Sequence, residues 1–180
     1  VATARRVFEL LRKLVRGTGD GNAILFTGRV RPFDRDHLFE QWRPHIMADR
    51  EERSPEDGPL YVVATQTVEV GANFDFDGLV TELAPIDALR QRFGRVDRLG
   101  RRGNTESVIV ARKDHLKRGY DDRIYGQALP YSWRWLKKQQ KGKANDKYVD
   151  MSADRFSLPH DPNEMNEMSS PRKAAPTMMP

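Results

Sequence analysis

Apolar residues recur along the first part of the chain in alternating helical and strand-like patterns. Between Ala4 and Val15 they fall at helical spacing, and Gly17 is expected to end this helix. Short apolar runs predict buried strands at residues 23–26, 60–64, 79–83 and 105–111. Further helices are expected at residues 36–42, stopped by Pro44, and at residues 86–93. Buried strands with connections of this length predict an α/β fold, with a parallel sheet and helices on both faces.

The rest of the chain is more polar. Residues 120–128 and 131–140 are each expected to be helical, and the last twelve residues are expected to be disordered by themselves. We therefore predict a domain at residues 1–112, a basic and partly helical extension at 113–150, and a flexible tail or linker to a further domain at 151–180.

Composition narrows the class of protein. The 180 residues carry a net charge of +5, which is compatible with a polyanionic partner without identifying one. Arginines concentrate at residues 90–102 and lysines at residues 137–147. The absence of cysteine excludes disulfides and thiolate metal sites, and it fits a cytoplasmic protein. No apolar run approaches membrane-spanning length, so no membrane partner is expected.

The segment Q-R-F-G-R-V-D-R-L-G at residues 91–100 is the most informative part of the sequence. Arg92, Arg95 and Arg98 are three residues apart and are predicted to lie on one helix face and its exit turn. Guanidinium groups are planar and always charged, and they bind phosphate oxygens in pairs. A row of them suits a polyphosphate, although spacing alone favours a solvated basic face equally well.

This segment resembles motif VI of superfamily-two helicases. Residues 60–77, L-Y-V-V-A-T-Q-T-V-E-V-G-A-N-F-D-F-D, resemble motif V, and residues 25–36 sit where motif IV belongs. The combination of A-T-Q-x-x-E-x-G, F-D-F-D and L-A-P-I-D is similar to the type I CRISPR-associated helicase–nuclease family, over residues 22–112. The resemblance implies the second RecA-like lobe of an ATP-dependent DNA helicase that acts in CRISPR antiviral defence.

The resemblance also implies roles for individual residues. These are catalytic Arg95 and Arg98, nucleotide-binding Gln91, Gly71, Asn73 and Asp75, and DNA-binding Thr65, Thr27 and Arg29. For Thr27 and Arg29, surface pairing with Asp34 and Asp36 stays open as an alternative. Asn73 stands where many relatives have an acid that binds the ribose, and an asparagine side chain can still accept and donate hydrogen bonds. Arg92 is open between a phosphate contact and an ion pair with Glu69 or Asp97. Asp75 and Asp77 are open between a functional role and turn formation.

Half of the ATP site that the resemblance implies is missing from the sequence. The phosphate-binding pattern G-x-x-x-x-G-K-[ST] does not occur, and the glycine-rich stretch at residues 17–22 has neither the lysine nor the hydroxyl that this pattern needs. The implied cofactor is ATP with Mg²⁺, and the metal would be held by the first lobe. The chain itself is expected to hold no metal and to be inactive alone.

The resemblance implies single-stranded DNA, the first helicase lobe and a CRISPR targeting complex as partners, and it leaves open whether a nuclease domain accompanies the motor. Two other functions stay open. One is the motor lobe of a restriction or repair translocase, and the other is a non-catalytic nucleic-acid-binding module.

Overall fold

The computed structural model describes residues 2–27, 32–49, 58–65, 73–143, 147–152 and 155–171, with only the backbone for residues 32–36. The chain divides into two compact units, Val1–Phe76 and Asp77–Pro180. The domain boundaries predicted after residues 112 and 150 stay a prediction. No helix among the described residues is both long and apolar enough to cross a membrane.

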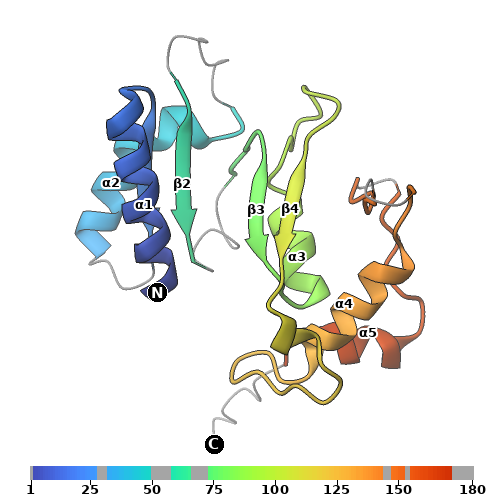
Figure 1. The fold of residues 1–180 in the computed structure, drawn as a ribbon. Helices are drawn as coiled ribbons and strands as arrows, with labels where there is room; N and C mark the ends of the chain where they lie inside the picture. Colours follow the sequence, from blue (N-terminus) through green and yellow to red (C-terminus); the bar gives the residue numbers. More distant parts are fainter. Residues whose placement is uncertain are drawn as a thin grey trace, which may run out of the picture. The chain divides into compact units, whose positions relative to one another are not determined.

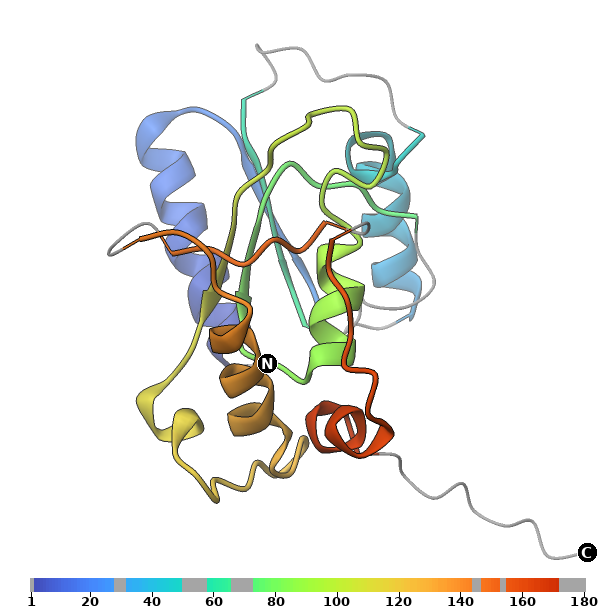
Figure 2. The same cartoon turned by 90° about the vertical axis from the view of Figure 1, so that its right-hand side faces the viewer.

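Unit 1 is a pair of parallel strands covered by helices (Figure 1). Its elements are α1 (Ala2–Thr18), β1 (Asn22–Phe26), α2 (Pro32–Ile46) and β2 (Leu60–Ala64). The strands pair in register from Asn22 opposite Leu60 to Phe26 opposite Ala64. Figure 2 shows α1 and α2 on opposite faces of this pair. The predicted α/β arrangement, with parallel strands and a helix on each face, is therefore confirmed within unit 1.

Two predicted helix ends in unit 1 were wrong. Helix α1 continues past Gly17 to Thr18, and the N–H of Gly19 then donates to the carbonyl of Val15 at 2.9 Å. Gly19 has a φ of 70°, the left-handed conformation with which many helices end. Helix α2 contains Pro44 and continues two residues beyond it to Ile46, although the missing N–H of the proline removes one helical hydrogen bond.

Among its described residues, unit 2 contains a second parallel pair and three α-helices (Figure 1). Its elements are β3 (Leu79–Glu82), α3 (Ile86–Phe93), β4 (Ser107–Val110), a 3-10 helix (Lys113–Leu116), α4 (Ala128–Lys138) and α5 (Pro162–Met168). Strand β3 pairs with β4 from Leu79 opposite Ser107 to Glu82 opposite Val110. The core joins the end of β3 to all three helices through buried Leu83, Leu89, Leu136 and Met168.

The helical segments after β4 differ from the prediction. Residues 120–128 do not form a helix, because the carboxylate of Asp122 accepts hydrogen bonds from the N–H groups of Ile124 and Tyr125. Asp122 also pairs with Gly126 in an isolated bridge, and Gly126 has a φ of 55°. The helix predicted at 131–140 exists but begins and ends earlier, as α4. Helix α5 was not predicted at all.

Candidate functional site

Two predicted DNA-binding residues of unit 1 lie side by side. Thr27 directly follows β1 and Thr65 directly follows β2, and the N–H of Thr65 donates to the carbonyl of Phe26 at 3.1 Å. Both therefore lie at the carboxyl edge of the strand pair, where ligands bind in open α/β sheets. Thr27 is buried, with 3% of its surface exposed, and Thr65 is half-buried. The third predicted DNA-binding residue, Arg29, lies outside the described residues.

The F-D-F-D segment is anchored in the core of unit 1. Phe74 is buried, packs edge-on against Phe39 with ring centres 6.0 Å apart, and forms an isolated bridge with Met47. The N–H of Asp75 donates to the carbonyl of Ile46 at 3.0 Å. This packing leaves the side chain of Asp75 buried, at 3% exposure.

The other predicted nucleotide-binding residues differ in exposure. Asn73 is exposed, and its carbonyl accepts a hydrogen bond from the N–H of Ala48 at 2.7 Å. Gln91 is exposed on α3 in unit 2, whereas Gly71 lies outside the described residues. The structure therefore leaves Asn73 and Gln91 accessible to a ligand.

The predicted row of arginines is divided between a helix and a loop. Helix α3 ends at Phe93, so only Arg92 is helical, while Arg95 and Arg98 belong to the connection to β4. We call residues 94–104 the arginine loop. The predicted helix end at residue 93 is confirmed, and Arg95 lies in the exit turn, where its N–H donates to the carbonyl of Arg92 at 3.1 Å. Only Arg98 departs from the expectation, because it lies farther along the loop.

The guanidinium of Arg92 is hydrogen-bonded to strand β3. Its Nη1 donates to Thr81 Oγ1 at 2.8 Å and to the carbonyl of Glu82 at 3.2 Å. Because Thr81 is only 6% exposed, the guanidinium of Arg92 provides a hydrogen bond to a buried hydroxyl on β3. Glu69 lies outside the described residues, so its ion pair with Arg92 stays a prediction, as does a phosphate contact.

Arg95 and Arg98 influence each other electrostatically. Partial burial, followed by repulsion from the charge of Arg98, lowers the pKa of the Arg95 guanidinium. Arg98 is exposed, whereas Arg95 is half-buried. Two cations held within range of mutual repulsion are stabilised when an anion binds both, so the pair is suited to phosphate oxygens.

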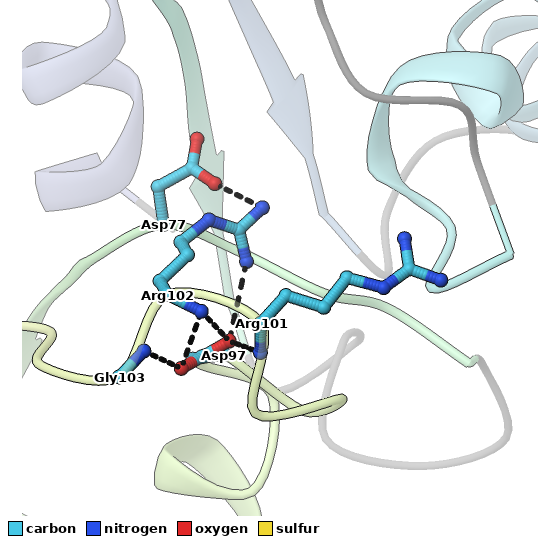
Figure 3. Close-up of polar contacts among 5 residues, drawn as sticks. All are labelled: Asp77, Asp97, Arg101, Arg102 and Gly103. Atoms are coloured by element: carbon cyan, nitrogen blue, oxygen red, sulfur yellow. Dashed lines mark hydrogen bonds and ion pairs between the residues drawn. The ribbon is translucent and has the colours of Figure 1, made fainter.

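Asp97 holds the arginine loop together (Figure 3). Its carboxylate accepts hydrogen bonds from the N–H groups of Arg101, Arg102 and Gly103, at 2.8 to 3.2 Å. Arg102 also makes ion pairs with Asp97 at 3.6 Å and with Asp77 at 2.6 Å. Sequence reasoning considered Asp97 only as an ion-pair partner of Arg92, and Asp77 only as a turn or site candidate. The sequence did contain a signal for this turn, because Asp97 stands among arginines and glycines and aspartate tolerates a left-handed backbone.

Comparisons with known proteins agree with the motifs. A family model described as "CRISPR-associated nuclease/helicase Cas3, C-terminal" matches residues 1–101. A relative from Methanocaldococcus jannaschii, whose name also places it with these nuclease/helicases, is 41% identical over 101 residues. That match covers 56% of this chain and 12% of the relative. The CRISPR-associated nuclease/helicase Cas3 of Methanothermobacter thermautotrophicus is 34% identical over 61 residues, or 34% of this chain and 7% of the relative.

Solved structures show the same fold. The crystal structure of T. fusca Cas3-ATP matches with a TM-score of 0.61 and 23% identity, covering 77% of this chain and 17% of that one. A structure described as a CRISPR RNA-guided surveillance complex, pre-nicking, matches with a TM-score of 0.56 and 22% identity, covering 76% and 18%. The chain thus spans a small part of each relative. Because the family model covers more than half of it, the chain belongs to the C-terminal family of the CRISPR-associated nuclease/helicase Cas3.

Proposed function

We propose that this chain is the second motor lobe of an ATP-dependent DNA helicase or translocase in CRISPR defence. Arg95 and Arg98 would contact the γ-phosphate of an ATP whose Mg²⁺ is held by a first lobe. When bound there, ATP supplies the phosphoryl transfer, and the two guanidiniums neutralise the charge that develops on the transferred group. We also assign nucleotide-binding roles to Gln91, Asn73, Asp75 and Gly71.

The observation that carries the proposal is the match of the Cas3 C-terminal family model over residues 1–101, a range that contains both Arg95 and Arg98. Partial burial and then the charge of Arg98 lower the pKa of Arg95, so the two guanidiniums repel each other. A single polyphosphate can pair with both of them and relieve this repulsion. One similar solved structure is of T. fusca Cas3-ATP, which supports ATP as the nucleotide.

Thr27, Thr65 and Arg29 would bind phosphates of single-stranded DNA. Hydroxyl groups at the edge of a strand pair can bind phosphates of the DNA backbone without reading bases, as a moving motor requires. The adjacent positions of Thr27 and Thr65 support this role. A similar solved structure belongs to a CRISPR RNA-guided surveillance complex, which supports such a complex as the partner.

The test is the rate of ATP hydrolysis by Arg98→Ala in a helicase that carries this lobe together with a first lobe. We expect kcat to fall about 10³-fold, with a much smaller change in nucleotide Kd, because the contact strengthens in the transition state. Arg98→Lys should recover little of the rate, since an ammonium lacks the planar fork. Arg118→Ala, an exposed arginine outside the arginine loop, is the control and should hydrolyse ATP normally.

The same variants separate the alternatives. Normal hydrolysis by Arg98→Ala contradicts the motor role. A non-catalytic nucleic-acid-binding module instead predicts that Arg98→Ala weakens DNA binding, with no hydrolysis to lose. A restriction or repair translocase predicts the same loss of hydrolysis, but no association with a CRISPR targeting complex in a pull-down.

A further inference from the structure

We propose that Asp97 is the positioning residue of the arginine loop. In this role its carboxylate fixes the backbone from which Arg98 and Arg101 extend, and so sets where their guanidiniums meet a phosphate. The effect on hydrolysis rests on the proposed function, whereas the anchoring of the loop does not.

The backbone of Asp97 is itself unusual. Its φ is 42°, in the left-handed region that only glycine enters without cost and that aspartate and asparagine tolerate better than other residues. This conformation turns the chain back on itself, and the N–H of Gly100 donates to the carbonyl of Asp97 at 2.9 Å. The turn brings three later N–H groups around the carboxylate. Only 9% of the Asp97 side chain is exposed.

The occupied N–H groups decide how the loop can bind a ligand. Successive N–H groups that point into one concavity form a common anion site in proteins. Here Oδ1 of Asp97 accepts from Arg101 and Arg102, and Oδ2 accepts from Arg102 and Gly103. The protein's own carboxylate thus fills the concavity, and a phosphate must be bound by side chains instead. Arg98 and Arg101 are exposed, and Figure 3 shows the side chain of Arg101 pointing away from Asp97.

Arg102 extends the anchoring beyond the loop. One of its guanidinium nitrogens lies 3.6 Å from Asp97, and the other lies 2.6 Å from Asp77 (Figure 3). Asp77 precedes β3 by two residues, so the ion pair ties the arginine loop to the start of that strand. Since 65% of the Asp77 side chain is exposed, this second tie adds less than the hydrogen bonds to Asp97.

Two substitutions distinguish the role of the Asp97 backbone conformation from the role of its carboxylate. Asp97→Gly suits the left-handed backbone better but removes every bond to the carboxylate. Asp97→Asn keeps a tolerant residue and one acceptor oxygen, but it loses the charge and the second acceptor. If only the turn mattered, glycine would be the better replacement. If the carboxylate matters, asparagine is the better one.

Limited digestion of the 180-residue chain with trypsin measures the anchoring directly, because trypsin cuts after Arg98, Arg101 and Arg102. We expect initial cleavage at these three sites to rise about tenfold in Asp97→Gly and by less in Asp97→Asn, in line with the loss of charge-assisted hydrogen bonds. Cleavage of Asp97→Gly at the wild-type rate would overturn the proposal.

The control is Asp150→Asn. Asp150 also accepts a backbone hydrogen bond, from Ser152 at 3.2 Å, and forms ion pairs with Lys141 and Arg155, but it lies outside the arginine loop. Its substitution should leave cleavage after Arg98, Arg101 and Arg102 unchanged. An equal increase in both variants would mean that general destabilisation opens the loop, which also overturns the proposal.

Hydrolysis in a helicase that includes a first lobe gives the second readout. We expect Asp97→Gly to lower kcat about tenfold or more with nucleotide Kd nearly unchanged, and Asp97→Asn to retain most of the rate. If Arg98→Ala is inactive while Asp97→Gly is normal, the positioning role is overturned and the proposed function stands. If Arg98→Ala is normal, the proposed function fails, and the digestion result still decides whether Asp97 anchors the loop.

Discussion

Arg92, Arg95 and Arg98 belong to one sequence motif but occupy three different environments. Arg92 donates to Thr81 and Glu82 of the strand beside it, Arg95 is half-buried, and Arg98 is exposed. The sequence shows three arginines at a spacing of three residues. Because α3 ends after Arg92 and before Arg95, their side chains have different surroundings. At this scale the residue type predicts the chemistry, and the local backbone decides which arginine can perform it.

Arg92 should therefore contribute to stability. Arg92→Ala removes two hydrogen bonds to the end of β3, one of them to the buried hydroxyl of Thr81. We expect the free energy of unfolding to fall by about 1 to 3 kcal/mol, measured by urea denaturation. Arg90→Ala, an exposed change on the same helix, should stay within about 0.5 kcal/mol of wild type. Equal stability of the two variants would show that these bonds do not matter in solution.

Among the elements, α5 shows most clearly how packing decides structure. It has only seven residues, mostly polar, and its N-terminus is capped by Asp161, whose side chain accepts from the N–H of Asn163 at 2.9 Å. Tertiary contacts hold it. Met168 is 1% exposed, its carbonyl accepts from Ser132 Oγ at 3.2 Å, and Ser170 donates to the carboxylate of Asp87 on α3.

Met168 should be the main anchor of α5. Met168→Ala leaves a cavity beside α4, and we expect it to lower the free energy of unfolding by about 2 to 5 kcal/mol. Hydrogen exchange should also become faster in α5 than in α1, because the lost contacts are local. Glu167→Ala is the exposed control on the same helix. Wild-type stability in Met168→Ala would mean that α5 does not pack against the rest of unit 2 in solution.

At the scale of the whole molecule, the proposed function requires a first lobe to complete the ATP site. The chain carries the arginines but no phosphate-binding loop. We expect the purified chain to release no phosphate from ATP above background, with or without single-stranded DNA, because nothing in it fits the phosphate and Mg²⁺ cradle of a motor. Adding a first lobe should restore DNA-stimulated release. Turnover by the chain alone at the rate of an intact helicase would contradict the two-lobe proposal.

Binding of single-stranded DNA by the chain should be weak, independent of sequence and sensitive to salt. The proposed contacts are to phosphates, so the logarithm of the affinity should fall with the logarithm of salt concentration, by about 0.7 per phosphate contact. Fluorescence anisotropy with two oligonucleotides of different sequence measures both properties. Thr65→Val should weaken binding to both equally, and Thr18→Val on α1 should not. A strong preference for one sequence would favour the nucleic-acid-binding module.

The sequence by itself determined the elements that local pattern controls and the chemistry that residue type controls. Alternating apolar runs predicted the four strands that the described residues form and helix α3. Three motifs in order predicted the Cas3 family and the site residues. The tertiary structure decided what depends on distant partners. It directed Arg92 to β3, closed the turn at Asp122, docked α5 through Met168 and wrapped the arginine loop around Asp97. Hydrogen bonds and packing between residues far apart in the chain have no period in the sequence, so only the folded chain reveals them.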